Sequence, residues 1–489
     1  MNKPVRRVAI AMLLLFGLLV VNANYIQVIK ATEYQQDPGN TRVLLEEYER
    51  QRGLIIVNGS SVANSVSTPA DQLKYLRRYA NGPVYAPATG YYSLIFSNSG
   101  IERAENDVLS GSSDSLFVRR LTDLFTGREP RGGNVELTLD ARTQQAAYDA
   151  LTETGATGAI VALDPQTGAI LAMVSTPSYD PNLLSSHDPT AIRDYAAQLD
   201  AAPVDPRLNR ATSDNYPPGS VFKLIVAAAA LENGLTPEST IPAPDVLTLP
   251  GTSTTLRNFG GSSCNGGADD TLLHALTISC NTAFAQLGID VGEDNLRDVA
   301  ERFGIDDTGY DMPLPVAQSS LGSIEDDAAL GQSSIGQRDV RLTPIETASI
   351  VATIASGGAF YQPHLVNETQ EPDLTVIDQA EVSELRQAID PEIAQDLTAM
   401  MVNVVAEGTG TRAQINGLDV AGKTGTAEVE DGVAPHAWFA GFAPADNPQI
   451  AVAVFIANGG SSQGETTGGV AAAPIAKTVM EAFLRIEGG

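Results

Sequence analysis

The chain has 489 residues, of which 43% are hydrophobic and 18% charged, a composition typical of a folded protein with about two to four domains. Its formal net charge is -29 and no basic stripe is present, which argues against nucleic acid as a partner, because phosphate binding needs clustered Lys and Arg. No cluster of cysteines and histidines has the spacing of metal ligands, so we expect neither a metal ion nor another cofactor.

An uncharged run from Val8 to Ile29 follows three basic residues and is closed by Lys30. As a helix it would be about 33 Å long, enough to cross a bilayer core of about 30 Å, and its basic flank would stay cytoplasmic. Residues 1–30 are therefore predicted to be a cytoplasmic tail and a single-pass transmembrane signal-anchor. The alternative is a cleaved signal peptide, since Val21-Asn22-Ala23 suits a small-residue cleavage site. Both interpretations place the remaining residues outside the cell membrane.

Residues 31–150 form a mixed, polar-rich region in which short strands and turns are expected. No group of residues in it suggests chemistry. We therefore predict a smaller, non-catalytic domain that serves as a docking surface or as a pedestal above the membrane. A helix with apolar spacing is expected at 143–152, after which the composition changes.

Residues 151–489 are predicted to form a domain of the α/β (α+β) class, with apolar runs near both of its ends and helices between them. Pro and Gly in the link Asp164–Gly168 indicate a β-hairpin between the first two runs. We expect a five-stranded, largely antiparallel sheet with an inserted helical lobe, and a cleft between sheet and lobe. The expected strands are 159–163, 169–174, 420–429, 437–442 and 450–457, and the expected helices are 222–232, 272–278, 282–287, 296–303 and 472–486.

The chain contains two cysteines, Cys264 and Cys280. In an exported protein they can pair, and a disulfide that closes a loop of this size would add about 3 kcal/mol of stability. Two free, buried thiols are the other interpretation, and the sequence does not decide between the two.

Lysine is scarce, and between Lys74 and Lys477 it occurs only at Lys223 and Lys423. Elsewhere in this stretch positive charge is carried by arginine, whose guanidinium stays protonated in proteins. A lysine amine loses its proton when it is desolvated or lies near another cation, so it can serve as a general base near neutral pH. The two isolated lysines therefore indicate an enzyme.

Ser220 and Lys223 form an S-x-x-K pattern at the expected start of the helix 222–232. Pro217 and Pro218 fit the residues before a helix, and residues three apart share a helix face, which places the Lys223 amine beside the Ser220 hydroxyl. The positive end of the helix dipole favours a developing alkoxide there. A hydroxyl with a base in reach is a candidate nucleophile. An incidental surface pair fits poorly, because the neighbours of the lysine are apolar.

Ser279 and Asn281 form an S-x-N pattern in a presumed loop between two helices. In a cleft, the hydroxyl can relay a proton and the carboxamide can hold a peptide amide. Taken alone the pattern is weak, since Ser and Asn in short loops are usually helix caps.

Lys423 and the three residues after it, Thr424, Gly425 and Thr426, lie on the expected strand 420–429. Gly425 lets another backbone approach closely, and threonine hydroxyls beside an ammonium suit a carboxylate. A backbone amide of this strand and that of Ser220 can together form an oxyanion hole. An edge strand with a solvated lysine is the alternative, which the scarcity of lysine makes less convincing.

The patterns S-x-x-K, S-x-N and K-T-G occur in this order on the expected helix, loop and strand, and together they resemble the signatures of penicillin-binding proteins. The resemblance covers the chain from about residue 158 to the C-terminus. No separate glycosyltransferase domain fits before it, so the chain is most similar to the monofunctional class B enzymes, in particular the short ones of actinobacteria. Further segments that carry the resemblance are Tyr216-Pro-Pro-Gly-Ser220, Gly331-Gln332, Leu342-Thr-Pro344, Gly408-Thr-Gly410 and Ala437-Trp-Phe-Ala-Gly-Phe442.

The resemblance implies a serine D,D-transpeptidase that cross-links the D-Ala-D-Ala stem peptides of peptidoglycan in growth or division and is acylated by β-lactam antibiotics. It also implies a membrane-embedded glycosyltransferase as partner. The implied catalytic residues are Ser220 as nucleophile, Lys223 as base and Ser279 as proton relay. The implied substrate-binding residues are Asn281, Lys423, Thr424, Gly425 and Thr426. On this basis we expect Lys223 to be at least transiently neutral and Lys423 to stay charged.

Other functions remain as alternatives. A class A β-lactamase would need a second base, a Glu in an E-x-x-L-N pattern, and Glu293-Asp-Asn295-Leu296 does not match it. A D,D-carboxypeptidase would differ mainly in using water as acceptor. A β-lactam sensor would bind without turnover, but it usually carries more membrane segments or a signalling domain. A purely structural scaffold would have no need of all three patterns.

Overall fold

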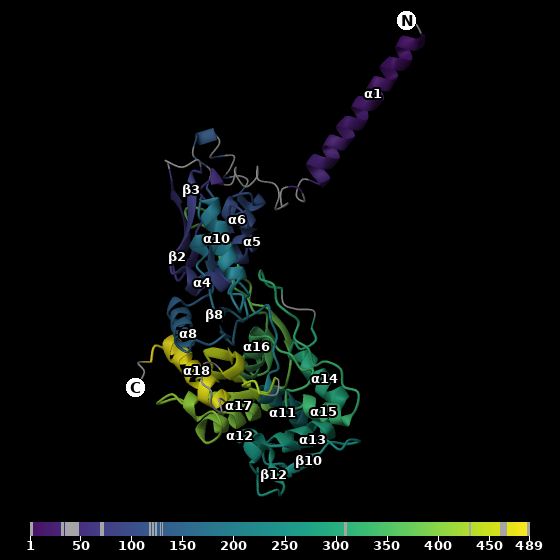
Figure 1. Cartoon of the computed structure of the whole chain (residues 1–489), viewed down its shortest axis with the longest axis vertical. Helices are drawn as coiled ribbons and strands as arrows, with labels where there is room; N and C mark the ends of the chain where they lie inside the picture. Colours follow the sequence, from purple (N-terminus) through teal and green to yellow (C-terminus); the bar gives the residue numbers. More distant parts are fainter. Residues whose placement is uncertain are drawn as a thin grey trace.

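The computed structural model describes residues 3–30, 34, 48–68, 73–116, 119, 122, 125–127, 129, 131–307, 311–429, 432–459 and 467–486. Residues 31–33 and 35–47, the start of the region predicted as a docking or pedestal domain, lie outside the described residues. The first element is helix α1 (Lys3–Asn24), which continues into the π-helical turn η1 (Tyr25–Ile29). Its apolar side chains are exposed, and among the described residues it is the one helix long and apolar enough to cross a membrane (Figure 1).

A six-stranded sheet forms the core of the region that follows α1. Its strands are β1 (Ile55–Val57), β2 (Ser60–Ser67), β3 (Tyr75–Tyr79), β6 (Asn134–Leu137), β14 (Val366–Gln370) and β15 (Val376–Gln379). The order is β15-β14-β6-β1-β2-β3, in which β1 and β6 run parallel and the other neighbours antiparallel. β14 and β15 fall within the range predicted for the catalytic domain, so this sheet joins segments far apart in the sequence.

Short helices and one hairpin complete this region. They are α4 (Gly82–Thr89), β4 (Tyr92–Ser93), β5 (Ser97–Asn98), α5 (Gly100–Ala104), α6 (Asn106–Ser110), α9 (Pro181–Leu184) and α10 (Pro189–Asp200). A small apolar cluster packs Ala86 of α4 against Leu184 of α9 and Ile192 of α10. The helices α4, α5, α6 and α10 therefore lie together with β2 and β3 at one end of the molecule (Figure 1).

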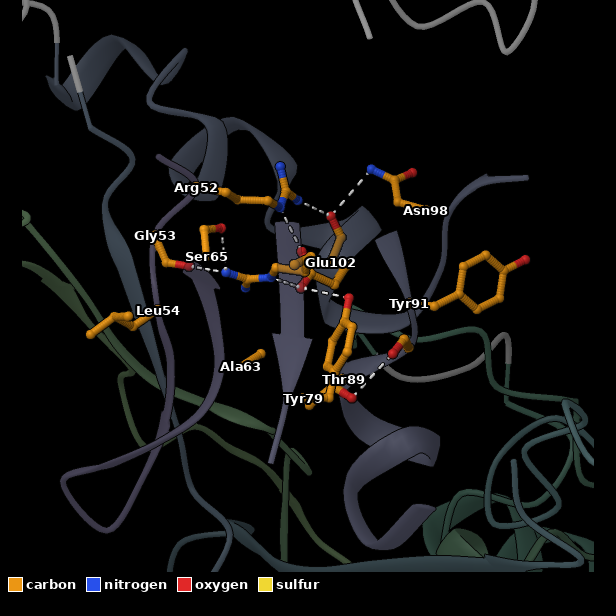
Figure 2. A network of polar contacts seen from close by, with 12 residues as sticks. Arg52, Gly53, Leu54, Ala63, Ser65, Tyr79, Thr89, Tyr91, Asn98 and Glu102 are labelled. Atoms are coloured by element: carbon orange, nitrogen blue, oxygen red, sulfur yellow. Dashed lines mark hydrogen bonds and ion pairs between the residues drawn. The ribbon is translucent and has the colours of Figure 1, made fainter. Parts of the chain in front are cut away.

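A buried ionic cluster connects the segment before β1 with β3 and α5 (Figure 2). Glu102 accepts from Arg52 Nε at 2.6 Å with one carboxylate oxygen, and from Arg77 Nε at 2.6 Å with the other. The hydroxyl of Tyr79 donates to the second oxygen at 3.0 Å, and Arg77 also donates to the carbonyl of Gly53. Burial alone would raise the pKa of Glu102, but the two guanidinium groups more than offset it and hold this pKa below its ordinary value.

The region predicted to be catalytic is built on a second sheet of five antiparallel strands. These are β7 (Gly158–Leu163), β8 (Ile170–Thr176), β17 (Ala421–Ala427), β18 (His436–Ala443) and β19 (Ile450–Ile456), in the order β17-β18-β19-β7-β8. Helices α8 (Ala141–Glu153) and α18 (Gly468–Leu484) cover one face, and α16 (Pro344–Ala355) covers the other. Both faces are thus buried, which explains why β7, β8 and β19 are largely apolar runs, whereas the edge strand β17 also carries Lys423 and two threonines.

A helical lobe is inserted between the outer parts of this sheet. Its helices are α11 (Lys223–Glu232), α12 (Leu272–Thr277), α13 (Asn281–Val291), α14 (Glu293–Arg302), α15 (Asp327–Ser333) and α17 (Pro391–Ala406). Two-stranded pairs flank it, formed by β9 (Thr240–Ile241) with β12 (Asp270–Thr271), β10 (Val246–Thr248) with β11 (Thr255–Arg257), and β13 (Ala359–Tyr361) with β16 (Glu384–Gln387). The predicted five-stranded antiparallel sheet with an inserted lobe is confirmed.

Candidate active site

Ser220 lies in η3 (Gly219–Phe222), a 3-10 turn that leads directly into α11. Gly219 has a φ of +54°, and a Cβ there would lie 2.5 Å from the carbonyl oxygen of Thr426. The turn is therefore pressed against β17, and only glycine fits at this position. The predicted helix 222–232 is present, but its first turn is tighter than an α-helix because of this contact.

Lys223 is the first residue of α11 and its side chain is fully buried. Its Nζ donates to Ser279 O at 2.7 Å, to Asn281 Oδ1 at 2.7 Å and to Ser279 Oγ at 3.3 Å. The ring of Phe284 lies beneath it, with its centroid 5.5 Å from Nζ. These hydrogen bonds hold the amine against the S-x-N segment at the start of α13. Lys223 itself follows Ser220 by three residues.

Ser279 occupies this loop with a φ of +63°, in the left-handed region that non-glycine residues rarely adopt. This backbone conformation turns both its carbonyl and its hydroxyl toward lysine amines. Ser279 Oγ lies 3.3 Å from Lys223 Nζ and 2.9 Å from Lys423 Nζ. One hydroxyl therefore bridges the two lysines, an arrangement along which a proton can move.

β17 forms the opposite wall of the site and is an edge strand of its sheet. Lys423 is fully buried, and its Nζ also donates to the carbonyl of Thr424 at 3.1 Å. A Cβ on Gly425 would lie 2.6 Å from Pro218 O and 2.9 Å from the Cβ of Trp438, so this glycine lets the strand approach the Ser220 turn. Among the residues that the structure describes, no strand pairs with the free side of β17.

The two lysines are electrostatically unlike ordinary surface lysines. Burial, and then the charge of Lys423, lower the pKa of Lys223 well below its usual value. Burial lowers the pKa of Lys423 to about 7. No carboxylate forms a salt bridge with either lysine within the described part of the chain. Lys423 can therefore gain or lose a proton near neutral pH, and the neutral form of Lys223 is more accessible than that of an exposed lysine.

A cleft of about 1020 Å³ opens above the lysines and is lined by Ser220, Ser279, Asn281, Thr424 and Thr426. The buried Lys223 and Lys423 lie under its floor, and Gly425 sits between the two threonines. The structure thus brings together all the residues that the sequence motifs singled out, although they span more than two hundred positions. None of the described Asp, Glu, His and Cys residues forms a group that could hold a metal ion.

Other residues of the cleft carry no signal in the sequence. Asn258 lies in the loop after β11 and accepts hydrogen bonds from the backbone amides of Asn281 and Thr282. Thr409 and Thr424 share a hydrogen bond between their hydroxyls at 2.6 Å. The Gly408-Thr-Gly410 segment was recognised as a signature, but nothing in its pattern predicts this contact.

Cys264 and Cys280 form a disulfide, which decides the question that the sequence left open. Cys280 lies between Ser279 and Asn281, and both cysteines line the cleft. The bond ties the segment after β11 to the start of α13. A second wall of the cleft is thereby joined covalently to the S-x-N loop.

Comparison with known families and proteins gives a consistent result. Residues 158–481 match the penicillin binding protein transpeptidase domain, and residues 52–135 match the penicillin binding protein A dimerisation domain. The chain is 48% identical to the peptidoglycan D,D-transpeptidase PbpA of Mycolicibacterium smegmatis, with 99% of both chains covered. It is 47% identical to PbpA of Mycobacterium tuberculosis, with both chains covered completely, at 100%.

Solved structures of penicillin-binding protein A from M. tuberculosis share the fold. A crystal structure of that protein superposes with a TM-score of 0.86 at 47% identity, covering 89% of this chain and 100% of the other. Its penicillin G acyl-enzyme complex gives a TM-score of 0.85 at the same identity and coverage of 89% and 100%. The chain therefore belongs to the penicillin-binding protein family and is a class B member of the penicillin-binding protein A type.

Proposed function

We propose that this protein is a peptidoglycan D,D-transpeptidase that cross-links stem peptides through an acyl-enzyme on Ser220 and is inhibited covalently by β-lactams. The relatives named PbpA and the β-lactam acyl-enzymes of the M. tuberculosis protein support this function. The observation that carries the mechanism is the chain of contacts Lys223–Ser279–Lys423 beside the Ser220 turn.

In the first step Ser220 Oγ attacks the carbonyl of the penultimate D-Ala, and Lys223 accepts the hydroxyl proton. A neutral amine keeps two N–H groups, which fit the acceptors at 2.7 Å, Ser279 O and Asn281 Oδ1. One lone pair then remains for the serine proton. The backbone amides of Ser220 and Thr426 stabilise the oxyanion, since β17 is an edge strand beside the turn.

The terminal carboxylate of the donor peptide binds Lys423 together with Thr424 and Thr426, while Asn281 holds its backbone. A bound carboxylate raises the pKa of Lys423, which is about 7 in the empty site, so substrate binding itself keeps this amine charged. The proton taken by Lys223 passes through Ser279 Oγ to the departing D-Ala amine, because that hydroxyl contacts both lysines.

In the second step the amine of a neighbouring stem peptide attacks the acyl-enzyme, which releases Ser220 and forms the cross-link. Lys223 and Ser279 act in reverse and take the proton from the incoming amine. A β-lactam enters as a mimic of D-Ala-D-Ala, but its leaving group stays tethered to the acyl group. The acceptor amine is thereby kept out and Ser220 stays blocked.

We also propose that α1 anchors the chain once in the cell membrane and that the catalytic domain lies outside the cytoplasm. The length and apolar character of α1 support the anchor, and the Cys264–Cys280 disulfide suits an oxidising compartment. A glycosyltransferase embedded in the same membrane would supply the glycan strands. Protease added outside intact spheroplasts should remove the catalytic domain, whereas resistance would contradict this topology.

Labelled penicillin tests the proposed chemistry directly. The full-length protein in detergent should form a stable adduct, Ser220→Ala should form none, and the matched cleft variant Ser263→Ala should behave like the wild type. Fast release of the label would indicate a β-lactamase. A D-Ala-D-Ala peptide, with and without an amine acceptor, then separates transfer from hydrolysis, and no turnover in either case would indicate a sensor.

A further inference from the structure

The start of helix α13 lacks the side-chain cap that its sequence position would normally supply. The N-cap residue is Cys280, whose sulfur is bonded to Cys264, and its side chain accepts no capping hydrogen bond. The first amides of a helix have no partner within the helix and need an outside acceptor. The residue that carries one of these amides is Asn281, a member of the S-x-N motif.

Asn258 supplies the missing acceptor from another segment of the chain. Its Oδ1 accepts from Asn281 N at 2.8 Å and from Thr282 N at 3.1 Å, while its Nδ2 donates to Ser262 O at 3.1 Å. Two donors on one side and a carbonyl on the other fix which way the carboxamide faces. The residue is 6% exposed, so these bonds form largely out of contact with water.

The backbone that Asn258 holds is that of a residue in contact with the proposed base. Asn281 Oδ1 accepts from Lys223 Nζ at 2.7 Å, and the neighbouring Ser279 offers its carbonyl at the same distance. A rotation of the first turn of α13 would move both acceptors away from the amine. The disulfide limits the position of Cys280 but satisfies neither amide, so it does not replace the contacts of Asn258.

We infer that Asn258 is a positioning residue for acylation: by capping α13 from the loop after β11, it holds the Asn281 carboxamide and through it the Lys223 amine in line with Ser220. The inference rests on the proposed function, because it concerns the base of that reaction. It assigns a role to the β10–β11 side of the cleft, which contributes none of the three motifs.

The test is the rate of acylation by labelled penicillin as a function of pH, measured on the full-length protein. Lys423 on β17 is the charged group that faces Lys223, and the charged or titratable groups farther out in the cleft are Arg257, His274, Arg338 and Glu428. None of these is altered by the variants. The matched control is Asn265→Ala, which removes an exposed carboxamide in the same loop that bonds only to Asp269 O.

We expect Asn258→Ala to acylate about ten-fold to a hundred-fold more slowly than the wild type, because a small misplacement of a catalytic group is costly. Asn258→Asp keeps an acceptor for both amides and should restore most of this rate. The acid limb of the pH profile is the range in which the rate of acylation rises as Lys223 loses its proton. The added negative charge of Asn258→Asp near Lys223 should move this limb to higher pH. Asn265→Ala should leave both the rate of acylation and the acid limb of its pH profile unchanged.

Two results would overturn the inference: wild-type rates in Asn258→Ala, or an equal loss in both Asn258 variants with no movement of the acid limb, which would mark the residue as structural only. If Asn258→Ala fails to fold, the pH position of the acid limb in Asn258→Asp still tests the inference. Failure of the proposed function looks different, because the wild type would then form no adduct that depends on Ser220.

Discussion

The protein buries basic side chains in two places, and the two clusters differ in whether a carboxylate lies beside them. In the N-terminal region the guanidinium groups of Arg52 and Arg77 share the carboxylate of Glu102, which is fully buried between them. In the active site Lys223 and Lys423 are equally buried but share only the hydroxyl of Ser279. One cluster places an anion between its two cations, whereas among the described residues no anion contacts the two lysines.

The difference follows from the chemistry of the two side chains. A guanidinium cannot shed its proton in a protein, so a buried one needs a fixed anion. An amine in the same surroundings can become neutral, and the lowered pKa values of Lys223 and Lys423 show that tendency. The choice of lysine or arginine thus separates a site that exchanges protons from one that holds a fold together.

The largest effect is expected when the active-site amine is made permanently charged. Lys223→Arg should slow acylation by penicillin by about a thousand-fold or more, because the guanidinium cannot accept the proton of Ser220. Lys477→Arg, on the partly exposed side of α18, is the control and should keep the wild-type rate. If Lys223→Arg is acylated at a rate close to that of the wild type, the active site does not need a side chain that can lose its proton, and the proposed difference between the two clusters is wrong.

Removing the anion of the other cluster should cost stability and not chemistry. Glu102→Gln removes the anion that two buried guanidinium groups share and should lower the free energy of unfolding by about 3–5 kcal/mol. Glu129→Gln, whose partner Lys74 is 3.8 Å away at an exposed site, should lower it by less than about 1 kcal/mol. Denaturant titration of the full chain measures both.

Acid should weaken the same cluster in the wild type. The pKa of Glu102 is lowered in the folded state, so its contribution is present above the unfolded pKa and is lost as pH falls through the folded one. The loss of stability below about pH 4 should be smaller in Glu102→Gln than in the wild type. Equal acid sensitivity in both proteins would contradict the assignment.

Acylation should show a bell-shaped dependence on pH with an effect of about ten-fold per unit on either side. It rises with pH as Lys223 becomes neutral, and it falls above pH 7 as Lys423, whose pKa in the empty site is about 7, loses the charge that binds the carboxylate. Penicillin esterified at its carboxylate should lose the basic limb and keep the acid limb. A basic limb that persists with the ester would not be due to Lys423.

The smallest effect is a gain in stability when one buried amine is removed. Lys423→Met should raise the free energy of unfolding by about 1 kcal/mol while impairing penicillin binding, because an uncompensated buried cation is costly. The pKa of Lys423 falls from its ordinary value to about 7 on folding, so the gain should be full below pH 7 and shrink as pH rises. Lys477→Met should change the stability by less than about 0.5 kcal/mol.

Local patterns in the sequence were sufficient for the catalytic sheet and the helix that follows Ser220. β7, β8 and β19 are buried on both faces and so appear as largely apolar runs, and Asn233-Gly234 marks the end of α11. The start of α18 was missed by four residues. Gly468 opens this helix because a Cβ there would lie 2.0 Å from Trp438 O, a contact with a strand distant in sequence.

Contacts that depend on distant segments could not be predicted in this way. The left-handed conformation of Ser279, the cap that Asn258 supplies and the pairing of the cysteines all depend on how the loop after β11 meets α13. The same holds for β14, which completes a sheet begun more than three hundred residues earlier. Periodicity reports which face of an element is buried, but not which segment buries it.

The mixed origin of the six-stranded sheet has a consequence for biosynthesis. β6 pairs with β1 on one side and with β14 on the other, so its second edge stays open until residues 366–370 have been synthesised. Until then the N-terminal part of the chain carries an unpaired strand edge, which is prone to associate with other chains. A nascent chain arrested before β14 should therefore depend on chaperones, even though its own N-terminal strands are complete.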